Sequence, residues 1–367
     1  MIYHNLTPPS PEEIEVSIFG PGRGECVVLH LGQNNWIIVD SCINRETREP
    51  IALEYLKKFN ISPSTAVKLI AVTHWHDDHI QGASKLLKEC EKATFVCSAA
   101  FLPSEFITFI NAFHNRSLIT NSGVDEFAEI IKTLWDEYQG RRPQATRLSF
   151  AMADRLLFNT QSPFSMKIYA LAPSDAAVTL ALNSFRELFP KPNTPKRRAV
   201  ALSPNDVSVV FWVTVGEFNI LLGGDLGIGE NDSLGWRAIV KSKNRPQSKA
   251  LIVKVPHHGS KSAYYKPMWE EMTVVNPIAL VTPFSSGIKP LPSERDIKRL
   301  KKHTNQLYCT NEPKGWKPAK RDSTSEKFIS SIIISRRKIE GPMGHVCVRL
   351  NHGKNPQIFC FPPARKL

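Results

Sequence analysis

Residues 67–79 read VKLIAVTHWHDDH, an apolar run of strand length that passes straight into three histidines and two aspartates. The β-branched and aliphatic residues of the run predict a buried strand. Four side chains of the kinds that bind Zn²⁺, Mn²⁺ or Fe²⁺ follow it: His74, His76, Asp78 and His79. On an extended loop His74 and His76 can point the same way, while a turn lets Asp78 and His79 face a second position. This stretch therefore predicts a metal site at a strand end.

Two later apolar runs also end in potential metal ligands. The run 221–224 (LLGG) leads into Asp225, and its two glycines allow the backbone to approach closely. The run 253–255 (VKV) leads through Pro256 into His257 and His258. A strand-terminal aspartate alone is more often structural. Three strand ends of this kind predict one shared cleft, because α/β folds place their chemistry at strand ends.

The rest of the chain alternates predicted strands and helices. Short apolar runs and helical spacing predict these elements, with strands at 14–20, 26–31, 36–40, 166–172, 207–215, 218–223, 250–255, 279–282, 329–335 and 345–350 and helices at 50–59, 83–90 and 293–301. Residues 100–160 carry helical patterns instead and predict an insertion that caps the site. We expect a single domain over residues 1–367, an α/β chain folded as a four-layer α/β/β/α sandwich.

Composition narrows the class of protein and its partners. Lys and Arg number 47 against 34 Asp and Glu, a net charge of +13. That surplus favours a polyanionic partner such as nucleic acid, although a generally basic enzyme has the same composition. Seven cysteines without a CxxC pair argue against a zinc ribbon or a disulfide framework. With no signal peptide and no apolar run of about 18 residues, we expect a cytoplasmic protein without a membrane partner.

The motifs HxHxDH, GGD and a histidine before glycine, in that order, resemble the metallo-β-lactamase superfamily. Within it they are most similar to ComEC-like hydrolase domains, a likeness also carried by FGPGRGECVVLHLGQNNWIIVD (19–40), NDVSVVFWVTVGEFNILLGGD (205–225) and KVPHHGS (254–260). The resemblance implies a metallo-β-lactamase sandwich and a set of metal ligands: His74 and His76 on one ion, Asp78, His79 and His258 on a second, and Asp225 between them. It also implies that Asp40 braces the histidine loop. Otherwise Asp40 is an ordinary turn carboxylate.

The sequence departs from that pattern at two points. Many superfamily members carry another histidine ligand before the later aspartate, and here the stretch 169–178 (YALAPSDAAV) has none. ComEC-like domains often have His-Pro where this chain has Leu291-Pro292. The ion on His74 and His76 is therefore expected to be completed by water, by substrate phosphate or by one of four polar residues: Ser174, Asp175, Asn205 or Asp206. We expect one firmly bound Zn²⁺ or Mn²⁺ ion and a second, labile one.

Three classes of function fit these motifs. The motif family, the charge and the carboxylate ligands favour a phosphodiester hydrolase, a nuclease on DNA or RNA ahead of a small-molecule enzyme, that uses metal-activated water. The alternatives are a hydrolase of ester, amide or thioester bonds and a non-catalytic binding protein. In the enzyme, Asp78 or Asp225 is expected to orient water and His257 to protonate the leaving oxygen. His257 could instead only hydrogen-bond near the ligands.

Weaker signals surround the histidine pair. Lys254 is a second, less favoured proton donor, and Ser260 is a candidate contact for a phosphate oxygen. Tyr264 and Tyr265 with Trp269 could stack a base, although Trp269 fits the core equally well. Basic groups at 196–198, 241–249, 298–301 and 336–338 could follow a phosphate backbone. Expected partners are nucleic acid or another phosphodiester and, in a larger assembly, protein.

Overall fold

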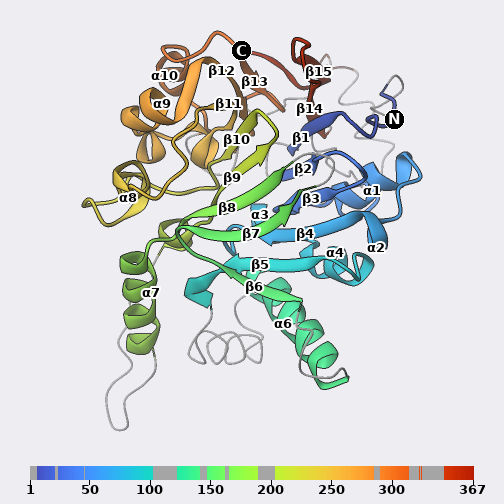
Figure 1. The fold of residues 1–367 in the computed structure, drawn as a ribbon, viewed down its shortest axis with the longest axis vertical. Coiled ribbons are helices and arrows are strands. Elements are labelled where there is room, and N and C mark those ends of the chain that lie inside the picture. The colour runs from blue at the N-terminus through green and yellow to red at the C-terminus, as the bar shows by residue number, and fades with distance from the viewer. Residues whose placement is uncertain are drawn as a thin grey trace.

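A computed structural model of the chain describes residues 6–20, 24–44, 46–101, 122–140, 147–161, 165–188, 203–284, 290–313, 322, 324 and 343–367. Two mixed sheets of eight strands each pack face to face, and helices cover both outer faces (Figure 1). This confirms the predicted four-layer α/β/β/α sandwich.

The first sheet has the strand order β15-β14-β1-β2-β3-β4-β5-β6. Its strands are β1 (Ile14–Gly20), β2 (Cys26–His30), β3 (Trp36–Val39), β4 (Val67–Val72), β5 (Thr94–Ser98), β6 (Leu148–Ala151), β14 (Gly344–Leu350) and β15 (Gln357–Phe361). The predicted hairpin of β1 and β2 is antiparallel, with Phe19 opposite Cys26. Strands β3 to β6 run parallel, so their carboxyl ends share one edge of the sheet.

The second sheet has the order β16-β13-β12-β11-β10-β9-β8-β7. Its strands are β7 (Arg155–Thr160), β8 (Met166–Ala172), β9 (Val210–Val215), β10 (Phe218–Leu222), β11 (Ala250–Lys254), β12 (Thr273–Val281), β13 (Leu307–Cys309) and β16 (Arg365–Lys366). Strands β10 to β13 are parallel. Their carboxyl ends therefore form a second shared edge, which carries the later ligand motifs.

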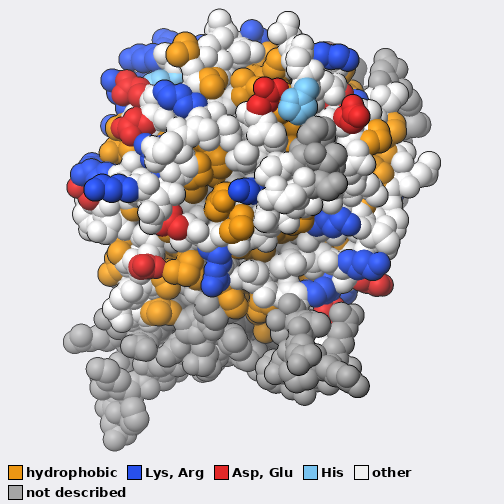
Figure 2. All heavy atoms as spheres, viewed as in Figure 1, with side chains coloured by type: hydrophobic (Ala, Val, Ile, Leu, Met, Phe, Trp, Pro, Cys, Tyr) orange, Lys and Arg blue, Asp and Glu red, His pale blue; other side chains and the backbone are white. Residues whose placement is uncertain are grey.

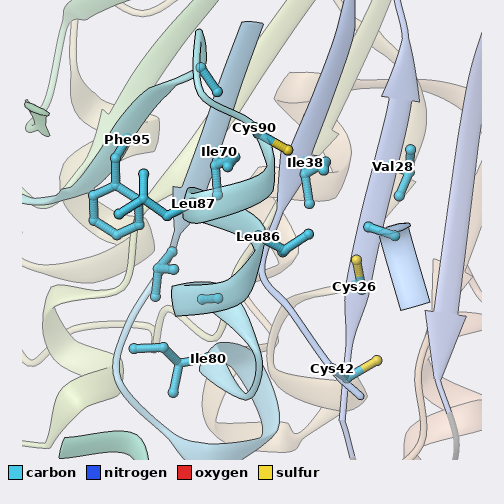
Figure 3. Packing of buried hydrophobic residues seen from close by; sticks show 14 of the residues in the cluster. Cys26, Val28, Ile38, Cys42, Ile70, Ile80, Leu86, Leu87, Cys90 and Phe95 are labelled. Carbon is cyan, nitrogen blue, oxygen red and sulfur yellow. The ribbon is translucent and has the colours of Figure 1, made fainter. Parts of the chain in front are cut away.

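Helices cover the two outer faces (Figure 1). They are α1 (Ile51–Lys58), α2 (Pro63–Ala66), α3 (Asp77–Ile80), α4 (Ala83–Glu89), α6 (Ser122–Gly140), α7 (Asp175–Leu188), α8 (Gly235–Lys241), α9 (Lys266–Met272) and α10 (Glu294–Leu300). One apolar layer lies between the sheets, and one lies under the helices on each side. On the first sheet, Leu86 and Leu87 of α4 pack near Ile38 and Ile70 (Figure 3). These three layers fix the sheets and so the strand ends that carry the site.

The expected helical insertion at 100–160 is only partly helical. Its DEFAEIIKTLWDEY pattern lies in α6, but residues 148–151 and 155–160 form β6 and β7, each an edge strand of one of the two sheets. Neither strand is buried on both faces, so neither shows the continuous apolar run that revealed the central strands. Residues 102–121 and 141–146, like the expected strand at 329–335, lie outside the described residues. Among the helices described, none has both the length and the apolar character needed to span a membrane.

Candidate metal centre

Two pairs of parallel strands, one pair from each sheet, end around one cavity of 470 Å³. Asp40 follows β3, the HWHDDH stretch follows β4, Asp225 lies beyond β10, and the histidine pair lies beyond β11. The cavity is lined by Trp75, His76, Asp77, Asp78, Pro204, Asn205, Asp225, His257, His258 and Phe284. The strand ends that the sequence singled out therefore meet at one place.

The backbone at these strand ends is unusual. Asp40, His257 and His258 have φ angles of 60°, 46° and 51°, in the left-handed region that side chains rarely adopt. Each such residue costs about 1–3 kcal/mol and persists only where surrounding contacts hold it, typically at functional sites. Gly224 also has a positive φ, and a Cβ atom on Gly223 would lie 2.6 Å from Pro256 Cγ. Gly223 is thus required by the close approach of this strand end to the segment of the histidine pair, and Gly224 by its positive φ and its approach to Ser208 and Val209.

In each of two buried histidines, the Nδ1 atom lies within hydrogen-bond distance of an oxygen acceptor. His79 Nδ1 lies 2.7 Å from Asp40 Oδ2, and His258 Nδ1 lies 3.0 Å from the carbonyl oxygen of Thr282. Because Nδ1–H of each ring donates a hydrogen bond to its acceptor, the Nε2 atom of each ring is left on the side of Asp78 and Asp225. Asp40 also accepts hydrogen bonds from the backbone and hydroxyl of Thr73. It braces the histidine loop in the way the resemblance implied.

The inward Nε2 atoms meet two carboxylates. Asp78 Oδ2 lies 3.6 Å from His79 Nε2 and 3.3 Å from His258 Nε2, and Asp225 Oδ2 lies 3.5 and 3.4 Å from the same atoms. Although buried, the two Nε2 atoms and Asp225 Oδ1 have no hydrogen-bond partner in the described structure. The ligand atoms of Asp78, His79 and His258 lie within 4.8 Å of one another, as do those of His74, His79 and Asp225. This donor set fits a divalent metal ion.

The charges of these four residues also favour the binding of a cation. Burial alone would raise the pKa of Asp78 and of Asp225, but His79 and His258 outweigh it and hold both carboxyl pKa values well below their usual range. Burial opposes protonation of the imidazoles, yet the carboxylates raise the pKa of His79 well above its ordinary value and that of His258 to about 10. Without a metal ion, these histidines therefore carry the positive charge that an ion would supply.

The other predicted subsite, at His74 and His76, is less complete. His74 Nε2 lies 3.0 Å from His76 Nδ1. Burial lowers the pKa of both rings, so they are neutral at pH 7. Of the residues considered as a further ligand, only Asn205 lines the cavity, and its buried Oδ1 has no hydrogen-bond partner among the described residues. Asp206 does not line it, and Ser174 and Asp175 line a separate cavity.

The remaining residues around the histidine pair separate into cavity and core positions. His257 faces the cavity, with Nε2 3.3 Å from Asn205 Nδ2 and Nδ1 3.3 Å from Ser262 Oγ. Burial lowers its pKa. Lys254 is buried away from the cavity lining, and Ser260 caps a 3₁₀ turn through its hydroxyl. Trp269 belongs to the core under α9.

Three residues near the ligands were not anticipated. Glu25 and Thr282 are buried beside the ligands, and Phe284 stacks on His258 at 5.3 Å between ring centroids. A signal for the first was present: Glu25 directly precedes an apolar strand, and Lys254 interrupts another one. A charged residue in a buried strand needs a buried partner, but the sequence does not say which one.

Comparison with known families agrees with this architecture. The model of the metallo-beta-lactamase superfamily matches residues 19–133, which include Glu25, Asp40 and the HWHDDH stretch. Residues 19–133 are thus similar to the metallo-β-lactamase superfamily, and the two-sheet sandwich is consistent with the fold of that superfamily. Members of the superfamily are metal-dependent hydrolases. No curated protein matched the sequence.

Similar solved structures include two metallo-beta-lactamases and a lactonase. SMB-1 has a TM-score of 0.33 and 13% identity over 72% of this chain and 83% of that one. A motif mutant of the enzyme from Cronobacter sakazakii has a TM-score of 0.32 and 11% identity over 60% and 64%. AidC, a dizinc quorum-quenching lactonase, has a TM-score of 0.31 and 15% identity over 55% of both chains. Structural similarity this low gives no information about activity, and membership of the ComEC-like subfamily remains a prediction.

Proposed function

We propose that the chain is a phosphodiester hydrolase that acts on nucleic acid with the help of one firmly bound and one labile divalent ion, Zn²⁺ or Mn²⁺. The observation that best supports the proposal is that the two metal subsites differ in their number of protein ligands. Asp78, Asp225 and two histidines surround one position, whereas His74 and His76 leave the other open to further ligands. A non-bridging phosphate oxygen is an anionic oxygen donor that could complete it.

The chain's own residues have distinct roles in this proposal. A divalent ion would lower the pKa of a water molecule and stabilise charge on the attacked phosphate. Asp78, which lines the cavity, accepts a hydrogen bond from that water and orients it. His257, also on the lining and held between Asn205 and Ser262, donates a proton to the leaving oxygen. Trp75 and Phe284 supply apolar surface on the cavity wall.

The charge of the chain supports a polyanionic substrate. The net charge is +13, and in the view of Figure 2 Lys and Arg side chains form several separate groups with Asp and Glu among them. Of the predicted basic groups, 241–249 and 298–301 belong to the described residues, whereas 196–198 and 336–338 lie outside them. We propose nucleic acid as the partner, and a protein partner in a larger assembly is compatible with it.

The test is hydrolysis of bis-p-nitrophenyl phosphate and of labelled single- and double-stranded DNA and RNA. Wild type and Asp78→Ala are compared after chelation and readdition of Mn²⁺, Zn²⁺ or Mg²⁺. We expect metal-dependent cleavage that is abolished in the variant, and polymer binding that weakens steeply as salt rises. Cleavage of the model ester alone, with salt-independent binding, would indicate a small phosphodiester. No phosphodiester cleavage with any metal would reject the proposal in favour of an ester, amide or thioester hydrolase or a binding protein.

A further inference from the structure

A buried ion pair lies directly behind the metal ligands. Lys254, the last residue of β11, and Glu25, just before β2, place Nζ and Oε1 2.6 Å apart, and both side chains are 2% exposed. The pair joins one sheet to the other. Neither residue lines the cavity, so neither is expected to touch substrate.

Lys254 contacts the strand end that presents Asp225. Its Nζ donates a hydrogen bond of 2.9 Å to the carbonyl oxygen of Gly224, whose φ is positive. The same Nζ lies 3.6 Å from Asp225 Oδ1. The ammonium group thus holds the turn on which this carboxylate depends and neutralises part of its charge.

Glu25 contacts the other ligands. Its Oε2 accepts a hydrogen bond from the hydroxyl of Thr282, whose carbonyl oxygen accepts from His258 Nδ1. Its backbone N–H donates to the carbonyl oxygen of Asp78 at 2.8 Å. Its Oε1 lies 3.9 Å from His79 Nδ1. One carboxylate residue is therefore linked to three of the four ligands of the more complete subsite.

We propose that Glu25, Lys254 and Thr282 are positioning residues that fix Asp225 and His258 for the firmly bound ion. Residues that hold metal ligands in this way typically change metal affinity by about 10- to 100-fold when removed. The inference concerns metal binding only, so it stands or falls independently of the phosphodiester substrate.

The first experiment uses the mildest variant. Thr282→Val removes the hydroxyl that joins Glu25 to this strand end and keeps the side-chain shape, whereas Thr282→Ser retains the hydroxyl. Zn²⁺ affinity of the full chain is measured by competition with a chromophoric chelator, and the melting temperature is measured on the metal-free protein. We expect affinity to fall about tenfold or more in Thr282→Val and to recover in Thr282→Ser. A lower melting temperature with unchanged affinity would show a purely structural role and overturn the proposal.

The second experiment replaces the ion pair as a unit. Lys254→Met alone would leave Glu25 charged, buried and unpaired, and that variant is expected to fold poorly. The double variant Glu25→Leu with Lys254→Met removes both charges, a change that is often neutral for stability. The matched control is Glu15→Leu with Arg349→Met, because Glu15 and Arg349 form another buried pair, 2.9 Å apart and 0% and 7% exposed, at the opposite end of β1 and β2.

Only the first double variant should lose Zn²⁺ affinity, by about 10- to 100-fold. Equal losses in both, or no loss in either, would overturn the proposal. A wild-type chain that binds no divalent ion would overturn it together with the metal site. Tight Zn²⁺ binding without phosphodiester cleavage would reject the proposed substrate and leave this inference in place.

Discussion

The two halves of the candidate metal centre differ in charge and in the contacts that support them. Asp78, His79, Asp225 and His258 form a buried, charged cluster in which each histidine is held by an oxygen acceptor on its outer nitrogen. On the other side, the rings of His74 and His76 are neutral and contact each other.

The difference has a physical consequence for metal affinity. Two carboxylates attract a divalent cation more strongly than two neutral imidazoles do, and pre-oriented ligands lose less conformational freedom on binding. His74 is itself supported, because the Thr73 hydroxyl lies 3.0 Å from its Nδ1 and donates to Asp40. His76 is partly exposed. We therefore expect the subsite of His74 and His76 to bind a metal ion more weakly mainly because it lacks charge and further ligands. Substitutions at each subsite can test this difference.

The largest effect is expected from His79→Ala. His79 is fully buried and contacts both Asp78 and Asp225, so its loss removes a ligand that both groups of donor atoms share. Hydrolysis should fall to background, and the firm ion should be lost. Elemental analysis after desalting, alongside the hydrolysis assay, checks both. Circular dichroism controls for folding, and near wild-type turnover in a folded variant would show that the two-subsite assignment is wrong.

His257→Ala should have the next largest effect, because His257 is on the wall of the open subsite. If it donates the proton to the leaving oxygen, the rate should fall by about 10²–10⁴-fold. Burial lowers the pKa of His257, so its donor form is lost as pH rises through a value below the ordinary 6.5. The activity that depends on this donor should therefore decline with pH in wild type and not in the variant. An unchanged rate and an unchanged profile would show that His257 only hydrogen-bonds its neighbours Asn205 and Ser262.

Much of this centre was predictable from sequence because its ligands lie within a few residues of strand ends. An apolar strand followed by a ligand-rich loop is a local pattern, and β4, β10 and β11 all show it. The supporting residues were not predictable in the same way. Thr282 and Glu25 are hydrogen-bonded across 257 residues of sequence, and no local pattern joins them. The sequence also could not show whether Ser174 or Asn205 is the better candidate for a further metal ligand. Only the fold shows that Ser174 lines a different cavity.

The edges of the sheets show the same limit. Strands β6 and β7 were read as part of a helical insertion, because partly exposed edge strands lack the buried apolar runs of central strands. Most central strands were predicted within a few residues of their observed bounds, but β12 begins earlier than expected, and β5 and β13 were not predicted. Burial on both faces makes a strand easier to recognise in sequence than pairing at an edge does, although the short buried strand β5 was missed as well.

A smaller effect is expected when the affinity for the firmly bound ion is measured at different pH values. The pKa of His258 is raised to about 10 and that of His79 is also raised, so both hold protons at pH 7 in the metal-free chain. An ion must displace those protons, and affinity should rise about tenfold per pH unit for each proton released. Chelator competition at pH 6, 7 and 8 measures the slope, and a flat profile would contradict the assignment of these ligands.

The raised pKa of His258 also determines the direction in which the stability of the metal-free protein changes with pH. Because the folded pKa of His258 exceeds its unfolded value of 6.5, its contribution is complete below pH 6.5 and is lost as pH rises through about 10. The carboxylates act in the opposite sense, since their lowered pKa values contribute stability that is lost in acid. Melting temperatures of the chelated chain should therefore decline from pH 7 toward pH 10, and added Zn²⁺ should remove most of that decline.

The smallest effect on the firm ion is expected from His76→Ala. His76 belongs to none of the groups of three ligands within the described residues, and its closest ligand neighbour is His74. Affinity for the first Zn²⁺ should stay close to wild type, while any second ion should bind more weakly or not at all. Titration calorimetry on the chelated variant separates the two events, with His79→Ala as the opposite case. A variant that lost the first ion instead would place His76 on the firm site, and the contrast between the two subsites would then have to be reversed.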